Sequence, residues 1–190
     1  MPYPAKLTPD LILSEAQTLL DNGGESALNM RPLAAALHVQ PSSLYRHFPD
    51  RGALLQALED AASTEFNRVL QTASAGKASR AALWAAAEAY LSYARAYPHR
   101  YGLLLSPHAP APVQPGPAKD LWNTVLGLVS ALSQTPDDTA RTVALWAFLH
   151  GFVVLERSGQ FGLSGPRGGF DTGLTALLDE MKRVAANRPE

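Results

Sequence analysis

The sequence predicts an all-α fold with about nine helices. Apolar residues recur at the three- and four-residue spacing of helices nearly throughout. No segment shows sustained apolar–polar alternation rich in β-branched residues, so strands are not expected. Two stretches rich in proline or glycine, at 107–117 and 160–169, separate long helical segments. Apolar residues make up 46% and charged residues 17% of the 190 residues, which is typical of a chain with a sizeable core.

Four helices are expected in succession from the N-terminus. Thr8 is the expected N-cap of the first helix, and Gly23 and Gly24 end it. A short second helix follows, and a short third helix begins at Pro41, where a missing N–H does little harm. Asp50 is a good cap for a long fourth helix that ends near residue 74.

The rest of the chain predicts five more helices. Pro98 ends the first of them, because proline cannot continue a helix. The expected helical segments are 80–97, 99–106, 118–134, 137–159 and 170–188. No internal repeat is present, so the helices are expected to pack as individual elements around a core.

Residues 30–48, "MRPLAAALHVQPSSLYRHF", contain two short helices separated by a tight turn. Ala34 is small where the two helices would cross, and Val39 and Leu44 are apolar where they would hold the corner. The turn falls at His38, in a left-handed position where glycine is common and histidine is tolerated. This pattern predicts a helix-turn-helix, which places its second helix in the DNA major groove. An ordinary helical hairpin is the alternative.

The second helix of this pair carries hydrogen-bonding side chains on its exposed side. Hydroxyls and guanidinium groups read base edges, while Tyr, Arg and His also bind phosphates. The net charge of −1 gives the chain no overall basic surface, so DNA binding would depend on local contacts. The expected DNA-binding residues are Arg31, Gln40, Pro41, Ser42, Ser43, Tyr45, Arg46, His47 and Arg51.

The segment "LNMRPLAAALHVQPSSLYRHFPDRGALL" resembles the DNA-binding motif of the TetR family of transcriptional regulators. The shared features are Arg-x-Leu-Ala in the second helix, a recognition helix ending in Leu-Tyr-x-His-Phe, and a cap, a basic residue and a Leu-Leu pair opening the fourth helix. With the first helix, the resemblance spans about residues 7–57. The family often has Lys where Arg51 stands and Gly where His38 stands.

The C-terminal part resembles the same family more loosely. "WAFLHGFVVLERSGQF" is similar to a Trp-x-x-x-His-Gly signature of one class of TetR C-terminal domains. The resemblance implies a homodimer formed through the last two long helices, a pseudo-palindromic double-stranded DNA operator, and a small-molecule pocket in each C-terminal domain. It also implies a helix-turn-helix DNA-binding domain at 1–52 and a helical ligand-binding and dimerisation domain at 53–190.

Aromatic residues of the C-terminal part are candidates for effector binding. A pocket between helices that is lined by aromatics and a few polar groups is a typical ligand site, and it favours an apolar or aromatic effector. Most such residues are core residues, and for Trp146, His150 and Gly151 helix packing or dimerisation is favoured over direct ligand contact. The candidate ligand-binding residues are Trp84, Tyr93, Trp122, Trp146 and His150.

Several other classes of function lack support in the sequence. The chain has no Cys, which excludes disulfides, thiolate metal sites and cysteine nucleophiles. An enzyme would need a convergent acid–base set, and only His150 stands out. The five His residues are scattered, with no i, i+4 pair among them, so no metal or cofactor is expected. The N-terminus lacks a signal peptide and no apolar stretch is long enough to span a membrane, so a cytoplasmic protein is expected.

The hypothesis that follows is a ligand-responsive transcriptional regulator, with repression favoured over activation. Its two recognition helices would lie one DNA turn apart, and an effector would favour a conformer with another spacing. The fourth helix would carry the motion between the two domains. The alternative is a helical ligand-sequestering or interaction module whose helix-turn-helix does not bind DNA.

Overall fold

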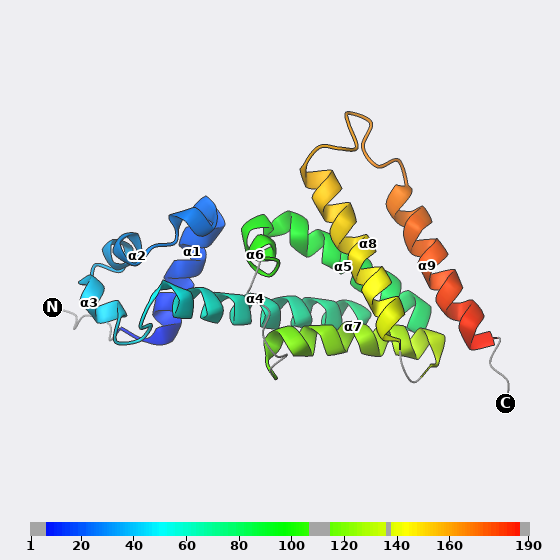
Figure 1. Ribbon diagram of the computed structural model, residues 1–190, viewed down its shortest axis with the longest axis horizontal. Coiled ribbons are helices and arrows are strands. Elements are labelled where there is room, and N and C mark those ends of the chain that lie inside the picture. The colour runs from blue at the N-terminus through cyan, green and yellow to red at the C-terminus, as the bar shows by residue number, and fades with distance from the viewer. Residues whose placement is uncertain (1–6, 107–114, 136–137, 187–190) are drawn as a thin grey trace. The chain divides into compact units, whose positions relative to one another are not determined.

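The computed structural model describes residues 7–106, 115–135 and 138–186, and all regular structure in these ranges is helical (Figure 1). The expected all-α fold with about nine helices is confirmed. The proline-rich connection expected from residue 107 lies outside the described residues as far as residue 114. The helices are α1 (Pro9–Ala27), α2 (Met30–Ala36), α3 (Pro41–Leu44), α4 (Arg51–Ser74), α5 (Ser79–Ala96), α6 (Pro98–Leu103), α7 (Pro117–Ser133), α8 (Thr139–Arg157) and α9 (Gly169–Ala186).

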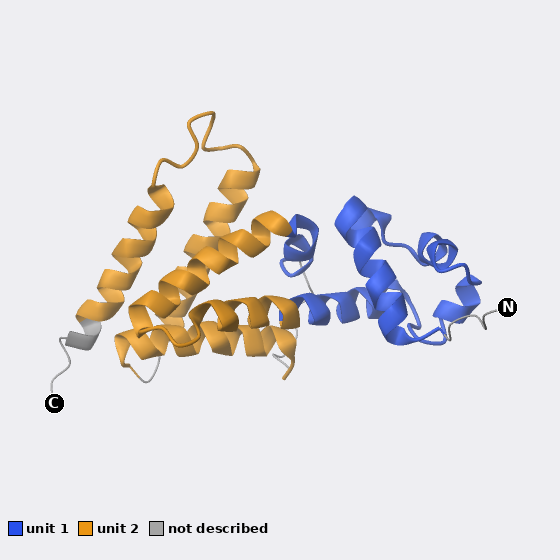
Figure 2. Ribbon diagram, turned by 180° about the vertical axis from the view of Figure 1, so that it is seen from behind, with its two compact units in different colours: residues 1–63, 97–112 blue, residues 64–96, 113–190 orange. Residues whose placement is uncertain are grey.

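The chain forms two compact units, coloured separately in Figure 2. Unit 1 consists of Met1–Ser63 and Tyr97–Pro112, and unit 2 of Thr64–Ala96 and Val113–Glu190. Helix α4 therefore begins in unit 1 and ends in unit 2. The sequence predicts a boundary between two functional domains after residue 52. The compact units divide within α4, after Ser63, and this division does not test where the functions separate, so the boundary stays a prediction. Unit 1 also includes α6, a segment that lies between α5 and α7 in the sequence.

Capping residues set the ends of the helices in unit 1. The Thr8 hydroxyl accepts a hydrogen bond from the backbone amide of Leu11 at 3.2 Å, and the Asp50 carboxylate accepts one from Ala53 at 2.8 Å. Both expected caps are thus confirmed. Gly24 has φ 68° and ψ −170°, which breaks the helical path of α1 before one further turn to Ala27. A residue with a side chain would be strained there.

The core of unit 1 is aliphatic. It unites the inner faces of α1, α2, α3 and the first turns of α4, and Leu103 of α6 joins the same cluster. Leu33, Leu44 and Leu54 have no exposed surface, and Ala34 is 1% exposed. Complete burial of these side chains holds α2 and α3 at a fixed angle, although each is too short to be stable alone.

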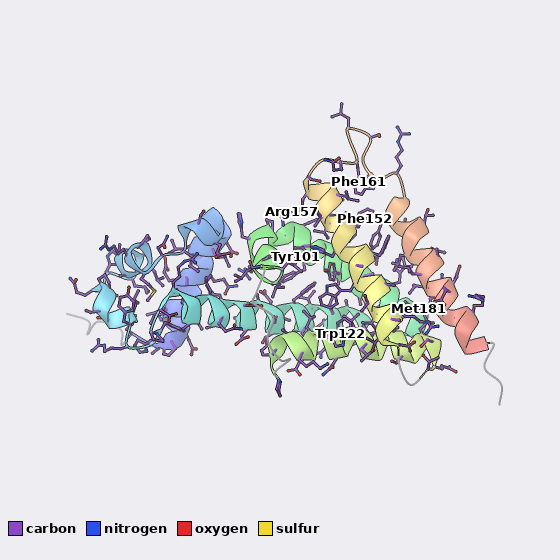
Figure 3. The ribbon with its side chains drawn as sticks, in the orientation of Figure 1. Tyr101, Trp122, Phe152, Arg157, Phe161 and Met181 are labelled. Carbon is purple, nitrogen blue, oxygen red and sulfur yellow. The ribbon has the colours of Figure 1, made fainter. Side chains whose placement is uncertain are left out.

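Unit 2 has a core rich in aromatic residues. Phe66 of α4 stacks on Tyr93 of α5, with ring centroids 4.4 Å apart. Phe148 of α8 fits against Gly173 of α9, where an added Cβ would lie only 2.4 Å from its ring. Figure 3 shows Phe152 and Phe161 near the end of α8 that leads into the glycine-rich connection, and their centroids are 5.0 Å apart. The contacts of Phe148 and Phe152 bind α8, the loop that follows it and α9 together.

The connection between α7 and α8 is held by a buried carboxylate. Asp138 has no exposed surface and accepts hydrogen bonds from the hydroxyl of Ser133 and the guanidinium of Arg141. Arg141 also pairs with Glu180 of α9 at 3.4 Å. This network joins three helices of unit 2. In the described ranges, no helix combines the length and apolar character needed to cross a membrane.

Candidate functional site

The turn between α2 and α3 is closed by backbone hydrogen bonds. The amide of Val39 donates to the carbonyl of Ala34 at 2.9 Å, and the amide of His38 donates to that of Ala35 at 3.1 Å. Together they form a Schellman motif, whose left-handed residue is usually glycine. His38 occupies that position with φ 54°, as the sequence predicted. The helix-turn-helix therefore forms despite the absence of glycine.

The exposed face of α3 and the turn that follows it carries part of the expected DNA-binding set. Ser42, Tyr45 and Arg46 are exposed, and their i, i+3, i+4 spacing places them on one side. Half of the Tyr45 side chain is accessible, at 50%. On the opposite side Leu44 is fully buried. The local sequence therefore separates a packing residue from three solvent-facing hydrogen-bonding residues.

The remaining expected residues of this segment differ in exposure. Gln40 is exposed at the start of α3, where its side chain makes no capping bond. Pro41 is the first helical residue, as expected, and is half-buried. Ser43 and His47 are also half-buried, since they lie one turn apart on the side nearer the core. Gln40 is thus the residue of this group that is most available to a ligand.

A depression of about 500 Å³ lies where the start of α2, the end of α3 and the start of α4 meet. Three expected DNA-binding residues border it, namely Arg31, Tyr45 and Arg51. Asn29 and Asp50 also line it, although neither is among the expected DNA-binding residues. Two guanidinium groups beside a phenol suit a phosphate group, although Asp50 adds a negative charge at the rim.

Arg51 is already engaged within unit 1. Its Nε donates to the carbonyl of Leu28 at 2.8 Å, and its Nη2 donates to the carbonyl of Glu25 at 2.9 Å and to the carboxylate of Glu25 at 3.2 Å. These bonds satisfy carbonyls at the C-terminal end of α1, where a positive charge is also favourable. Arg51 therefore has a structural role that the sequence did not predict. Its role in DNA binding stays a prediction.

In unit 2, Tyr93 and Trp84 of the candidate ligand-binding set make intramolecular contacts. Tyr93 is only 3% exposed and packs on Phe66, with its hydroxyl donating to the carboxylate of Glu65 at 3.4 Å. The indole N–H of Trp84 donates to Glu88, one turn along α5, at 3.1 Å. Tyr93 is thus a core residue in this structure, while Trp84 is half-buried beside a carboxylate.

The other three members of that set lie on α7 and α8. The rings of Trp122 and Trp146 are 5.9 Å apart, and the structure brings these two together. His150 follows Trp146 by one turn of α8, and all three are half-buried. Trp146 borders a cavity of about 10 Å³, which is room for about one water molecule. A ligand would require these side chains to move, and their role in ligand binding stays a prediction.

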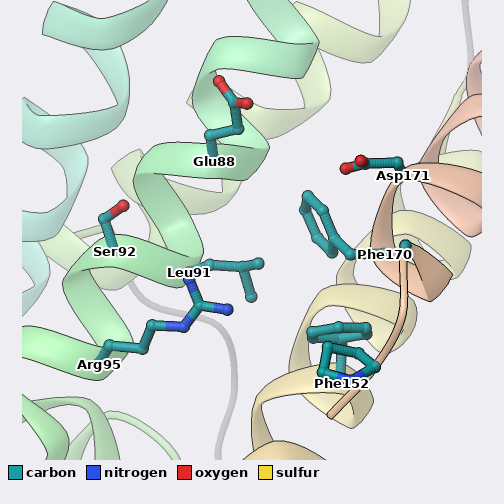
Figure 4. Close-up of a pocket in the computed structure, with 9 residues that line it drawn as sticks. Glu88, Leu91, Ser92, Arg95, Phe152, Phe170 and Asp171 are labelled. Carbon is teal, nitrogen blue, oxygen red and sulfur yellow. The ribbon is translucent and has the colours of Figure 1, made fainter. Parts of the chain in front are cut away.

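A larger pocket, of about 510 Å³, opens between α5, α8 and the start of α9 (Figure 4). None of the five candidate ligand-binding residues lines it. The sequence did contain a signal for this pocket. Its four lining residues on α5 recur with the i, i+3, i+4, i+7 spacing of one helix face, and three of these four are polar. The lining residues are Glu88, Leu91, Ser92, Arg95, Phe152, Pro166, Gly168, Phe170 and Asp171.

One ion pair lies beside this pocket. Arg95 donates from Nε and Nη2 to the two carboxylate oxygens of Glu156, at 2.8 and 2.7 Å. The hydrogen bonds from Arg95 lower the pKa of Glu156 and outweigh the opposing effect of partial burial. Both groups therefore stay ionised at neutral pH, and the negative charge of Glu156 largely compensates the positive charge of Arg95. Within the described ranges, no group of three or more His, Asp or Glu side chains is arranged to hold a metal ion.

Two family models match this chain. Residues 12–58 match the model described as bacterial regulatory proteins, tetR family, and residues 83–181 match the model described as tetracyclin repressor-like, C-terminal domain. The second match alone covers more than half of the chain. The first includes the whole of α2, the turn and α3.

Individual relatives agree with these models. An uncharacterized HTH-type transcriptional regulator of Mycobacterium tuberculosis is 29% identical over 159 residues, which cover 82% of this chain and 73% of the relative. The class A tetracycline repressor from a transposon in Escherichia coli is 42% identical over 60 residues, or 32% of this chain and 28% of the repressor.

A solved structure shares the fold over nearly the whole chain. It belongs to a protein of unknown function from a Rhodococcus species, which is 26% identical with a TM-score of 0.77, over 96% of this chain and 97% of that one. The helix-turn-helix, the helical unit 2 and both family matches lead to one conclusion. This chain belongs to the TetR family, and it is a ligand-responsive DNA-binding transcriptional regulator.

Proposed function

We propose that this chain is a homodimeric repressor that binds a pseudo-palindromic operator and releases it when unit 2 binds a small molecule. The observation that carries the proposal is the solvent-facing row of Ser42, Tyr45 and Arg46 on a rigidly packed helix-turn-helix. Hydroxyl and guanidinium groups at this spacing can reach base edges and phosphates in one groove.

The proposed DNA contacts follow the exposure of the expected residues. Ser42, Arg46 and Gln40 are assigned to base edges, and Tyr45 and Arg31 to phosphates, since Arg31 and Tyr45 share the depression at the start of α2. The other four expected residues are assigned one of two roles: they support the exposed face of the helix-turn-helix, or they contact DNA after small movements of their side chains. They are Pro41, Ser43, His47 and Arg51. Few cations take part, so the salt dependence of binding should be shallow for this class of protein.

The proposed dimer uses the outer face of α8. Val143, Val154 and Leu155 are 51%, 47% and 45% exposed, which is unusual for large apolar residues on one helix. Ala147 and Gly151 lie between them, and a Cβ added to Gly151 would meet no atom of the chain within 4 Å. Close approach of a helix from a second copy would explain both the apolar face and the glycine.

The proposed response to an effector is a shift between two conformers of the dimer. An effector that binds one conformer more tightly favours it, and operator affinity falls if that conformer spaces the recognition helices unfavourably. The abundance of aromatic residues in unit 2 supports an apolar or aromatic effector. No acid–base set in the described part of unit 2 calls for an enzymatic role instead.

The test is selection from a pool of random duplexes with the purified full chain at near-physiological salt, followed by sequencing. The proposal expects enrichment of a pseudo-palindrome with half-sites about 34–36 Å apart, as for other dimeric helix-turn-helix proteins. The variant Arg46→Ala serves as the control and should enrich no related sequence. A dimer that enriches no sequence would instead support a ligand-sequestering or interaction module.

A further inference from the structure

We infer that the pocket between α5, α8 and the start of α9 binds a lipophilic cation, meaning an organic amine or onium ion with an apolar body. The inference rests on the proposed function, because it names the chemical class of the effector. The pocket lies wholly within unit 2. It shares no residue with the outer face of α8 that is assigned to the dimer.

The size and walls of the pocket suit a small organic molecule. Its volume of about 510 Å³ falls in the range of ligand pockets, about 300–1,000 Å³. Leu91 of α5, Phe152 of α8 and Phe170 of α9 are each at least nine-tenths buried and provide an apolar floor. The centroids of Phe152 and Phe170 are 5.1 Å apart at an interplanar angle of 66°. Pro166 and Gly168 supply the rim from the α8–α9 connection.

The charges around this floor favour a cation. Glu88 and Asp171 are exposed acids on opposite walls, and Figure 4 shows Asp171 extending from α9 toward α5. Arg95 also lines the pocket, but its two hydrogen bonds to Glu156 largely compensate its charge. The charged lining residues are two carboxylates and one guanidinium, and this guanidinium is paired with Glu156 beside the pocket, so the four side chains together carry a net negative charge.

The two acids that line the pocket are not equivalent. The bond that Glu88 accepts comes from the neutral indole of Trp84, a donor that brings no positive charge. Asp171 lies in the first turn of α9, where the partial positive charge of the helix end offsets part of its own. Glu88 should therefore contribute more to binding. Phe152 and Phe170 both line the pocket, and aromatic rings attract cations, whereas an anion would meet two carboxylates.

The experiment compares two ions of similar shape and opposite charge. Tetraphenylphosphonium and tetraphenylborate are titrated separately into the full-length protein in a calorimeter. We expect the cation to bind at least about tenfold more tightly than the anion, because attraction and repulsion act at short distance in a partly enclosed site. Both ions present the same four phenyl rings, so apolar burial contributes almost equally to the two affinities.

Isosteric variants then locate the binding. Glu88→Gln should weaken binding of tetraphenylphosphonium by about three- to tenfold, and Asp171→Asn by less, from the loss of one nearby charge. The matched control is Asp120→Asn, which removes an exposed acid from the first turn of α7, away from the pocket lining. It should leave the affinity unchanged. Because all three residues are exposed, the variants are expected to fold, and circular dichroism verifies this.

The inference is overturned if tetraphenylphosphonium fails to bind, if the two ions bind equally well, or if the double variant Glu88→Gln with Asp171→Asn binds like the wild type. Operator selection is measured separately without either ion. Sequence-specific DNA binding without cation binding would refute only the pocket assignment. Cation binding at Glu88 in a protein that selects no DNA would refute the proposed function and leave the pocket assignment standing.

Discussion

Arg100 of α6 and Asp21 of α1 are joined by two parallel hydrogen bonds, from Nε to Oδ1 at 2.9 Å and from Nη2 to Oδ2 at 2.6 Å. The Arg100 side chain is 14% exposed, and its guanidinium carbon lies 4.4 Å from the centroid of the Tyr97 ring. This bidentate pair fastens α6 to unit 1, although the chain reaches α6 directly from α5 of unit 2. Charge-assisted bonds with this geometry are among the stronger polar contacts in proteins.

The first prediction concerns this pair. Asp21→Asn should lower the free energy of unfolding by about 1–3 kcal/mol, because it leaves a mostly buried guanidinium without its counter-charge. Urea unfolding followed by circular dichroism measures the change. Glu25→Gln is the matched control. The other two hydrogen bonds of Arg51 go to backbone carbonyls, so this variant should change stability by less than about 1 kcal/mol. Equal effects of the two substitutions would refute the prediction.

The second prediction concerns the left-handed turn residue. His38→Gly should stabilise unit 1 by about 0.5–1 kcal/mol, since φ 54° is unfavourable for a residue with a Cβ and free for glycine. His38→Ala keeps the Cβ and serves as the control, so it should give no such gain. Thermal or urea unfolding distinguishes the two. A loss of stability in the glycine variant would mean that the imidazole makes a stabilising contact.

The third prediction separates DNA-contacting arginines from the structural one. Arg31→Ala should reduce the slope of log K against log salt by about 1, as expected for one lost phosphate contact. Arg51→Ala should instead lower the unfolding free energy, because three hydrogen bonds at the end of α1 are lost. Its salt slope should stay close to that of the wild type. Fluorescence anisotropy with the selected operator at several salt concentrations gives these slopes, and a reduced slope for Arg51→Ala would assign it to a phosphate.

The fourth prediction concerns pH. Burial acts to raise the pKa of Asp138, but hydrogen bonds from Ser133, Thr135 and Arg141 together outweigh it, so its pKa lies below the ordinary value. A lowered folded-state pKa means that the ionised form stabilises the fold. This stabilisation is complete above the pKa of the unfolded chain, about 3.9, and is lost as the pH falls toward the folded-state value.

Asp138→Asn removes this titration. The difference in unfolding free energy between wild type and variant should therefore be constant from pH 7 to about pH 5, and should shrink below about pH 4. Urea unfolding at pH 7, 5 and 3.5 measures it. Ser158→Ala, an exposed substitution on the other end of α8, should give a difference that does not depend on pH. A difference that grows on acidification would contradict the assigned direction.

The fifth prediction concerns two glycines with opposite surroundings. Gly173→Ala should destabilise the protein by about 1–3 kcal/mol, because its Cβ would overlap the ring of Phe148. Gly151→Leu meets no atom of its own chain near the Cβ, so any folding defect should be small. It should raise the dimer dissociation constant at least about tenfold if α8 packs against a second copy. Sedimentation equilibrium measures the dissociation constant, and an unchanged value would remove Gly151 from the interface.

Local signals in the sequence predicted the helices and the binding motif well. Thr8, Asp50, Pro41 and His38 each act through their own backbone or a residue a few positions away, so neighbouring letters of the sequence contain the necessary information. The same holds for Ser42, Tyr45 and Arg46, which share a face because of helical periodicity alone.

For Arg51 and the aromatic residues of unit 2, local sequence signals did not predict which groups they contact. The sequence suggested Arg51 as a DNA contact, yet its guanidinium reaches back 23 positions to Leu28, a partner that only the packing of α1 against α4 determines. Tyr93 and Trp146 were chosen because they are aromatic, but side-chain chemistry does not separate a core from a ligand pocket. That difference depends on unfilled volume, which is set by how several helices meet.

By itself, then, the sequence determined the all-α fold, the caps and the turn of the helix-turn-helix, and the solvent-facing row of Ser42, Tyr45 and Arg46, since these follow from interactions within a few residues. Only the tertiary structure decided that α6 belongs with α1, that Arg51 caps a helix, and that Glu88, Phe152, Phe170 and Asp171 surround one pocket. Each of these depends on side chains brought together from separate helices, and their distances are fixed by close packing rather than by spacing along the chain.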